Sequence, residues 1–407
     1  MRTIVIALIV ITIAVAPLMA PLTAAQIGIP ILIDLAHKQP TAGLDIIMNV
    51  VPEASWYVLV RTKEDADALP AAIKARATVV IGDFATVDLE RLRIAMVIIG
   101  QPQAPLTPEE IAALAKWFTA APGRALWVAA DSDYPAQGSE LAQEVANMIM
   151  EAIGSNLRMD YTSAYCYVSL NLTGANYRLL GYVNVSEVPV LRYGSDLVLF
   201  HGPGPLAWVD DAGNWRRLSP TEKPHNAYII AMTSPFSEIT ENQVEPTGKN
   251  AKVYKPGDKG QFVLMAAQLI PVKGKYNVAI LSGETPYGGY YPGVAWQYYG
   301  VVLSGPRFVR NVILWATGYM GELKEYARLA ALPEQIRSDV DRTLTQLRSD
   351  IERRISSVEA TVAGISSTLN AALALAAVAL ILAIAALALA FRRPAPKPSA
   401  ETVVKQV

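Results

Sequence analysis

The sequence has almost no cysteine and no excess of charge of either sign. One cysteine, Cys166, stands among 407 residues, so no disulfide bond can form within the chain. The formal net charge is −1 at pH 7, which gives no electrostatic case for binding nucleic acid. A domain of this size can be stable on its hydrophobic core alone. The fold must therefore be held by packing rather than by covalent cross-links.

The sequence also lacks the short fingerprints of the common enzyme families. We find no His-Glu-x-x-His, P-loop, Gly-x-Ser-x-Gly or Gly-x-Gly-x-x-Gly pattern, each of which would point to a specific chemistry. No tandem repeat is visible outside the C-terminal quarter of the chain. These absences favour a protein that is not an enzyme, and nothing in the sequence calls for a cofactor or a resident metal.

What the sequence does contain is a long apolar run near its C-terminus. Residues 371–391 carry no charge, and as a helix these 21 residues span about 31 Å, the hydrocarbon thickness of a bilayer. Arg392 and Arg393 follow at once, and positive residues beside a span stay on the cytoplasmic side. The run predicts one transmembrane helix, with residues 392–407 as a short cytoplasmic tail.

Residues 321–370, which precede this span, have the pattern of a stalk. From Ile336 to Leu369 apolar residues recur with gaps of 4, 4, 3, 4, 4, 3, 4, 3 and 4. The first two blocks are eleven-residue repeats and the rest are heptads, which predicts a slightly right-handed coil that becomes left-handed near the membrane. A narrow apolar stripe on a charged helix needs a partner. We expect a parallel homo-oligomeric coiled coil of undecided chain number; the alternative is that the stripe packs on the chain's own globular domain.

The N-terminus predicts export. Residues 1–25 have a positive start, an apolar run and small residues before Ala25, which is the layout of a cleaved signal peptide; the alternative is an uncleaved signal anchor. Both place the middle of the chain outside the cytoplasm; with the signal peptide cleaved, the sequence predicts a single-pass protein of the cell membrane. Asn171 and Asn184 begin sequons for glycosylation, which makes a glycoprotein permissible.

Residues 26–155 alternate between strand and helix patterns. The expected strands are 30–35, 56–61, 77–81, 94–99 and 125–130, and the expected helices are 44–51, 87–93, 107–119 and 139–153. The helix at 107 has a strong start, because Thr107 can cap it, Pro108 suits its first position and two glutamates follow. The alternation predicts an α/β fold with a doubly wound, mostly parallel sheet.

From residue 156 to 255 the pattern is β-rich, which we interpret as an insertion or second subdomain. The expected strands here are 188–193, 196–200, 206–209 and 227–232, with a hairpin turn between Trp208 and Trp215. Residues 256–320 return to the α/β domain, with strands at 260–269 and 276–281 and a helix at 308–320.

The order of these pieces resembles a known fold. A strand ending in Leu32-Ile33-Asp34, a strand running into Asp131-Ser132-Asp133, and the late strands at 262–267 and 278–283 are similar to the class I glutamine-amidotransferase-like fold. They resemble its non-catalytic branch, which includes a gliding-motility transport component, an intraflagellar-transport protein and a non-catalytic subunit of oligosaccharyltransferase. The resemblance implies a scaffold or binding subunit. Cys166 fits this branch, because it has no Gly-x-Cys-x-Gly context and is expected to be a small buried residue.

Polar side chains follow several of the expected strands. In open parallel sheets, ligands bind beyond the carboxyl ends of the strands, so we expect one crevice there, able to bind a divalent metal or sugar hydroxyls. The alternative is that these groups cap helices or bind loop amides. The candidate ligand-binding residues are Asp34, His37, Asp131, Asp133, His201 and Glu284.

A loop rich in rings and glycine directly follows Glu284. It contains Tyr287, Tyr290 and Trp296, and exposed rings of this kind suit sugar stacking or a partner surface. The alternative is that the rings fold inward over the core.

These patterns together predict a membrane-anchored extracytoplasmic scaffold or accessory subunit, carried on an oligomeric stalk. Its partners would be further copies of itself and a membrane complex or envelope component. The alternatives are an extracytoplasmic solute- or glycan-binding protein and, with less support, a metal-dependent hydrolase.

Overall fold

The computed structural model describes residues 28–135, 139–192, 194–319 and 334–391. The chain divides into two units, Met1–Ala331 and Leu332–Val407, and each is described by itself. The expected signal peptide at 1–25, the first part of the expected stalk and the expected cytoplasmic tail at 392–407 lie outside the described residues.

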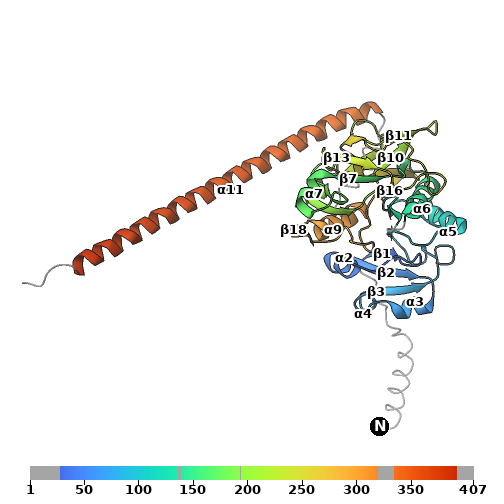
Figure 1. The fold of residues 1–407 in the computed structure, drawn as a ribbon, viewed down its shortest axis with the longest axis horizontal. Coiled ribbons are helices and arrows are strands. Elements are labelled where there is room, and N and C mark those ends of the chain that lie inside the picture. The colour runs from blue at the N-terminus through green and yellow to red at the C-terminus, as the bar shows by residue number, and fades with distance from the viewer. Residues whose placement is uncertain (1–27, 136–138, 193, 320–333, 392–407) are drawn as a thin grey trace, which may run out of the picture. The chain divides into compact units, whose positions relative to one another are not determined.

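The first unit is built on one large sheet (Figure 1). Its ten strands lie in the order β3 (Ala77–Ile81), β2 (Ala54–Val60), β1 (Ile29–Asp34), β4 (Met96–Ile99), β5 (Ala125–Ala129), β16 (Lys275–Ser282), β15 (Val263–Val272), β12 (Ala227–Met232), β8 (Arg178–Tyr182) and β9 (Leu197–His201). Neighbours are parallel from β3 to β16 and antiparallel from β16 to β9. The expected α/β architecture with a mostly parallel sheet is confirmed.

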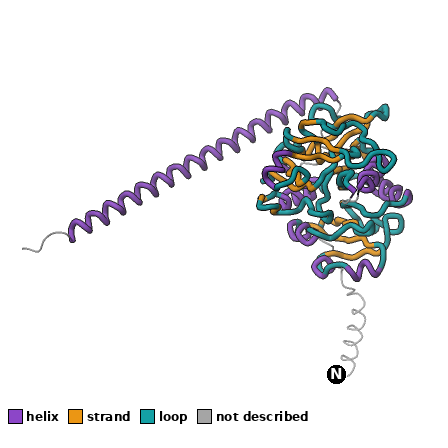
Figure 2. The backbone as a smooth tube through the Cα atoms, viewed as in Figure 1, coloured by secondary structure: helices purple, strands orange, loops and turns teal. Residues whose placement is uncertain are grey.

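Helices cover both faces of this sheet (Figure 2). Along β1, Ile31 and Ile33 point into one core and Leu32 into the other, as the two-residue period of a strand requires. The first core includes residues of α2 (Leu44–Val50), α4 (Ala71–Lys74), α8 (Pro189–Arg192) and α9 (Gly305–Ala316). The second includes residues of α5 (Pro108–Ala120) and α6 (Ser139–Ala152). The short helix α3 (Lys63–Ala68) buries no residue.

The segment from 156 to 255 does not stand apart from this sheet, because it supplies β8, β9 and β12. Its other strands form two three-stranded sheets, one of them together with β14 (Lys259–Gly260), which follows the segment. The first sheet is β11 (Trp215–Arg217), β10 (Leu206–Val209) and β6 (Leu157–Met159); the second is β14, β13 (Ser237–Thr240) and β7 (Ser163–Cys166). β10 and β11 form the expected hairpin, in which Asp210 accepts a hydrogen bond from the backbone of Asn214 at 2.8 Å. The pair β17 (Gln297–Tyr298) and β18 (Val301–Val302) and the helix α7 (Tyr167–Thr173) complete the unit.

Two expected elements are wrong. Residues 87–93 form successive turns, not a helix, and Arg93 ends them with a left-handed φ of 54°. The expected strand at 188–193 contains α8 instead. Pro189 is suited to the first position of a helix, and the turn that follows buries Leu191.

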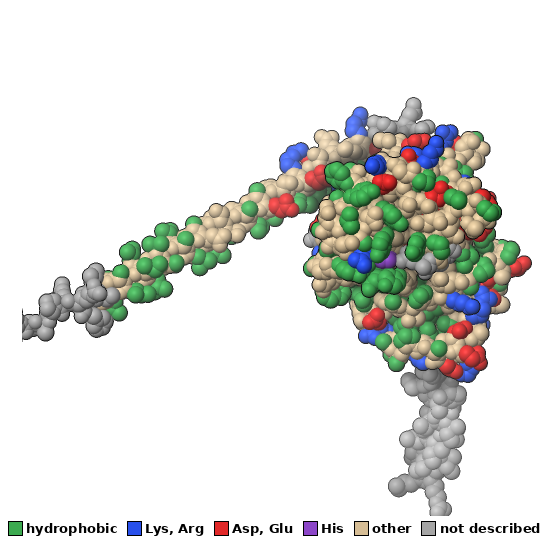
Figure 3. Space-filling model, viewed as in Figure 1, with side chains coloured by type: hydrophobic (Ala, Val, Ile, Leu, Met, Phe, Trp, Pro, Cys, Tyr) green, Lys and Arg blue, Asp and Glu red, His purple; other side chains and the backbone are tan. Residues whose placement is uncertain are grey.

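The described part of the second unit is one helix, α11 (Glu334–Phe391), of 58 residues. Its charged side chains lie in the N-terminal half and hydrophobic ones dominate the C-terminal half (Figure 3). By length and composition it is able to cross a membrane, with a mean hydropathy of 2.5 in its most apolar window. This helix contains both the expected span at 371–391 and most of the expected stalk.

Candidate functional site

In an open α/β sheet, ligands bind at the carboxyl ends of the two neighbouring strands from which the chain connections run in opposite directions. In this sheet those two strands are β1 and β4. The side chain of Tyr287, which is fully buried, occupies this point. Its hydroxyl donates a hydrogen bond to the carbonyl of Asp34 at 2.6 Å and accepts one from the amide of Gly100 at 3.0 Å. Any Cβ on Gly100 would lie 2.9 Å from the Tyr287 ring. The chain therefore fills the crevice with its own side chain.

Local geometry explains why Tyr287 reaches this position. The loop after β16 turns sharply at Gly288, whose φ is 71°. The amide of Gly288 donates to the carbonyl of Ala42 at 2.7 Å, and a Cβ at this position would lie 2.6 Å from the carbonyl oxygen of Pro40. Only glycine tolerates both the left-handed backbone and this close approach. The loop is thus pinned against the segment that follows β1.

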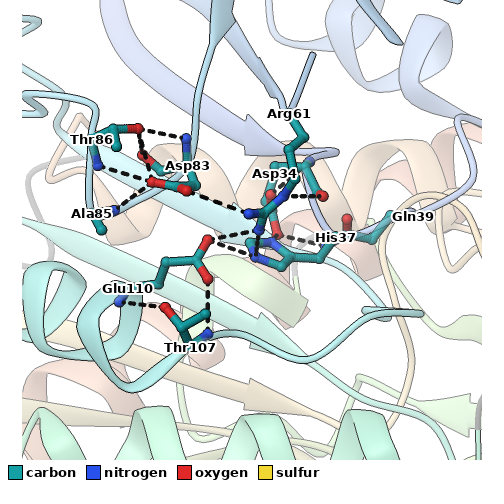
Figure 4. A network of polar contacts seen from close by, with 10 residues as sticks. Asp34, His37, Gln39, Arg61, Asp83, Ala85, Thr86, Thr107 and Glu110 are labelled. Carbon is teal, nitrogen blue, oxygen red and sulfur yellow. Dashed lines mark hydrogen bonds and ion pairs between the residues drawn. The ribbon is translucent and has the colours of Figure 1, made fainter.

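Asp34 and His37 belong to a buried network at the end of β1 (Figure 4). His37 Nδ1 lies 2.7 Å from Asp34 Oδ2, and His37 Nε2 lies 3.0 Å from Glu110 Oε1. Arg61, which follows β2, donates to the same Glu110 oxygen at 2.9 Å. Nδ1 faces the Asp34 carboxylate, whereas Nε2 lies near both the Glu110 carboxylate and the Arg61 guanidinium, whose NH2 nitrogen is 3.1 Å away. The network joins the end of β1 to the start of α5.

The pKa values of this network follow from its charges. Burial alone would lower the pKa of His37, but the hydrogen bond and charge of Asp34 and the charge of Glu110 outweigh it and raise the pKa above 6.5. Burial would raise the pKa of Glu110, but the Thr107 amide and the His37 charge outweigh it and lower the pKa. The charges of Asp34 and Glu110 therefore favour the protonated form of the His37 ring.

Asp131 and Glu284 form a second buried group, at the ends of β5 and β16. Burial raises the pKa of both carboxyls well above their usual range, and Asp131 adds to the rise at Glu284. Asp131 accepts hydrogen bonds from the Ser132 amide at 2.8 Å and from Gln101 Nε2 at 2.9 Å. Glu284 accepts from the amides of His201 and Thr285. A cavity of about 10 Å³ beside Glu284 is lined also by Trp127 and Phe308, enough for a single water molecule.

Asp133 lies in a third group with different partners. It accepts hydrogen bonds from Ser163 Oγ at 2.6 Å, from Asn242 Nδ2 at 2.8 Å and from the amide of Gln243 at 3.1 Å. The carboxylate ties the loop after β5 to the loop after β13. In the part of the chain that the structure describes, the polar residues at the strand ends thus belong to three separate groups rather than to one.

His201 lies under a group of exposed aromatic rings. Its ring is 5.1 Å from that of Tyr290, 5.7 Å from Tyr291, 5.8 Å from Tyr177 and 6.0 Å from Tyr298. Burial, assisted by the charge of Arg178, lowers the pKa of His201 to about 4. The ring is therefore neutral at pH 7, and the tyrosine rings pack against it.

The outer aromatic rings of this group face solvent. Tyr290 is 69% exposed, Tyr299 is 55% exposed and Trp296, in the same loop, is 59% exposed. The guanidinium of Arg178 lies 3.8 Å from the centroid of the Tyr299 ring. We call this group the aromatic surface; it consists of Tyr177, Arg178, Tyr290, Tyr291, Trp296 and Tyr299. Of the three predicted aromatic residues, Tyr290 and Trp296 are exposed and Tyr287 is buried.

Sequence reasoning missed Arg61 and Glu110 in the first group, Gln101 in the second, and Tyr177 and Arg178 in the aromatic surface. Glu110 carried a local signal, because it is the third residue of a helix and completes a capping box with Thr107. Nothing local indicates that it also reaches His37, 73 positions away. Cys166 is fully buried, as predicted, with its sulfur 3.3 Å from Ser234 Oγ.

Both sequon asparagines are accessible: Asn171 is exposed on α7 and Asn184 is exposed in the segment after β8. Within the described ranges, no three His, Cys, Asp or Glu side chains are grouped so that they could hold a metal ion.

Comparisons with known proteins give little support for an assignment. No family model matches the chain, and no curated protein matches it. Among solved structures, the mmIFT52 N-terminal domain is similar to it with a TM-score of 0.40 and 12% sequence identity, over 71% of this chain and 97% of that one. A likeness this weak carries no argument about fold family or function.

Replacing Tyr287 by phenylalanine tests how the crevice is closed. The change leaves the Gly100 amide and the Asp34 carbonyl without their buried partner, so we expect a loss of about 1–3 kcal/mol in the free energy of unfolding. Denaturant unfolding of the full-length protein measures it. The matched control is Tyr290→Phe, at an exposed ring, where the change should stay within about 0.5 kcal/mol. Equal stability of Tyr287→Phe and wild type would contradict this role.

The His37 network predicts a pH-dependent stability. Because the pKa of His37 is raised on folding, its contribution is complete below about pH 6.5 and is lost as the pH rises through the folded-state value. We expect His37→Gln to cost about 1.5–3 kcal/mol at pH 6 and progressively less towards pH 9. Unfolding measured from pH 6 to 9 tests this, with His225→Gln, at an exposed histidine, as control. A cost for His37→Gln that does not change with pH would refute the cationic ring.

Proposed function

We propose that this chain is a membrane-anchored scaffold whose α/β domain binds a partner outside the cytoplasm and carries out no chemistry of its own. The proposal adopts the amidotransferase-like, non-catalytic interpretation of the sequence. The observation that carries it is the closed crevice: Tyr287 occupies the position where folds of this architecture bind small ligands.

The buried polar groups support the same conclusion. Each predicted strand-end carboxylate accepts hydrogen bonds from the protein itself, and those donors come from different loops. A general acid or base must reach a substrate within hydrogen-bond distance, whereas Asp34, Glu284 and Asp133 face into the protein and are buried. Structural ties between loops account for these carboxylates.

The aromatic surface supports binding at the outside of the domain. Exposed tyrosine and tryptophan side chains are enriched in the central parts of protein interfaces. Here the rings are held by contacts with one another, since Tyr291 lies 4.8 Å from both Tyr290 and Tyr298. Rings already fixed in place lose little conformational entropy when a partner binds.

The anchoring part of the proposal rests on α11 and on the ends of the chain. α11 is able to cross a membrane by length and composition. The Arg392-Arg393 pair after the span favours a cytoplasmic C-terminus, and the signal-like start of the chain favours export of the domain. In this arrangement Asn171 and Asn184 are exposed sequons on the glycosylated side of the membrane.

One observation favours a second candidate, the binding of an acidic glycan. Arg178 lies between Tyr177 and Tyr299, and among the described residues no carboxylate forms an ion pair with it. The Tyr298 hydroxyl, beneath the same rings, is buried and has no hydrogen-bond partner in the described part of the chain. A pyranose ring stacked on tyrosine with its carboxylate at Arg178 would satisfy both the stacking and the charge.

Cross-linking in the native membrane tests the scaffold. Full-length protein is cross-linked, captured and its partners are identified by mass spectrometry. We expect reproducible membrane or envelope proteins, whose capture falls about tenfold or more in Tyr290→Ser/Trp296→Ser, because central aromatic residues dominate interface energy. The matched control is Ile81→Ser, an exposed apolar residue on β3 at the far edge of the sheet. Equal capture by all three proteins would remove the aromatic surface from the proposal.

A binding assay with immobilised polysaccharides tests the second candidate. We expect retention on a polyuronate but not on its neutral counterpart, and a loss of about tenfold or more for Arg178→Gln, because hydrogen bonds to charged groups contribute most. The control is Arg216→Gln, which removes an arginine of β11 that is paired with Asp210. Retention that is the same on both polymers would exclude a specific acidic-glycan site.

A further inference from the structure

The apolar stripe of α11 has a regular spacing that the described structure leaves exposed. Its side chains are half exposed or more, and no other described element of the unit Leu332–Val407 covers them. The stripe consists of Leu347, Ile351, Ile355, Val358, Val362, Ile365 and Leu369. We propose that three copies of this chain associate in parallel and in register along this stripe, so that the protein is a homotrimer. This inference rests on the proposed membrane anchoring.

A second copy of the chain is the partner that matches the stripe in length and height. α11 continues without a break from the stripe into the candidate span. Two copies anchored in one membrane with the same orientation therefore present identical stripes at identical heights. Each apolar layer of one helix then meets the same layer of its neighbour, as parallel coiled coils require.

The charges beside the stripe complement one another in this arrangement. With Ile355 and Val362 at heptad positions a and Val358 and Ile365 at positions d, Arg354 occupies position g and Glu359 position e of the following heptad. In a parallel, in-register coil, position g of one helix lies beside position e of the next heptad of its neighbour. Arg354 of one copy therefore meets Glu359 of another. An antiparallel pair would not bring these two positions together.

The heptad frame continues into the candidate span and changes character there. Every position of the seam from 372 to 386 is alanine: Ala372, Ala376, Ala379, Ala383 and Ala386. The larger side chains, such as Leu373, Leu380 and Ile381, occupy the other positions. In water a coil is driven by burying large apolar side chains, whereas helices in lipid pack closely through small ones. One continuous seam thus suits both surroundings.

The stripe also indicates the number of chains. Parallel dimers favour β-branched residues at a with leucine at d, whereas β-branched residues at both positions favour larger assemblies. Here both d positions nearest the membrane, Val358 and Ile365, are β-branched, and so are Ile355 and Val362 at a. We therefore assign three chains, the smallest closed assembly larger than a dimer.

The mass of the full-length protein in a mild detergent tests this assembly. We expect three chains for wild type and for Ser356→Gln/Ala363→Gln, whose changes lie at outward b positions, and one chain for Ile355→Gln/Val362→Gln, the seam variant, whose changes lie in the seam. The two variants carry the same new residues on the same helical turns. A single-chain or two-chain wild type would overturn the trimer, and so would equal dissociation of the two variants. A stripe packed on the chain's own domain would give the single-chain result.

Disulfide cross-linking reports the orientation independently. Native Cys166 is fully buried, so a cysteine introduced at Val358→Cys is the reactive thiol. We expect rapid bonding between copies for Val358→Cys and at least tenfold slower bonding for Ser357→Cys, one position along. Similar rates would overturn the parallel seam. Partner capture through the aromatic surface is measured separately in the seam variant. If wild type is not a trimer but single chains still capture a partner, the trimer is refuted and the scaffold is not. If wild type is a trimer but captures no partner, the scaffold is refuted and the trimer is not.

Discussion

The arrangement of the domain depends on the two hydrogen bonds of the Tyr287 hydroxyl. The carbonyl of Asp34 lies at the end of β1 and the amide of Gly100 directly follows β4. These are the two strands from which the chain connections run in opposite directions. In an open α/β sheet these are the groups around which a ligand would bind. The loop after β16, which lies two strands from β4 in the sheet, satisfies them instead. Because a buried hydroxyl with two partners is costly to remove, the crevice is closed by the same contact that ties the early and late parts of the chain together.

The buried carboxylates follow the same logic. A charge taken out of water must be paired or neutralised. The buried carboxylates of this domain meet that requirement in different ways. Asp34 faces the His37 ring, Glu284 has a pKa raised by burial, and Asp133 accepts hydrogen bonds from residues about a hundred positions away in the sequence. Acidic residues at strand ends, which are typical of catalytic sites, here accept hydrogen bonds that connect loops. The proposed recognition surface is the group of exposed rings around Tyr290.

Local signals in the sequence predicted many of the elements, with 87–93 and 188–193 as exceptions, but not which strands pair. The apolar run before Asp34 and the capping residue Thr107 predicted β1 and α5, since each depends on neighbours along the chain. The strand order was beyond reach, and so was the addition of β8, β9 and β12 to the main sheet, because strand pairing is settled by contacts distant in sequence. The same limit applies to the site. His37 was identified as a candidate, whereas its pairing with Glu110 needed the folded chain.

In the proposed trimer, the aromatic surface and the stalk have complementary physical consequences. Interfaces that bury a modest area often bind weakly on their own. Linking binding modules makes the second contact intramolecular, and the gain in avidity reaches roughly 10²–10⁴ when the geometry permits simultaneous contact. Three parallel stalks would present three copies of the surface at one height above the membrane. A partner that is itself repetitive, such as an envelope polymer or a symmetric membrane complex, would then be held firmly by contacts that are individually weak, whereas a single isolated partner molecule would exchange rapidly.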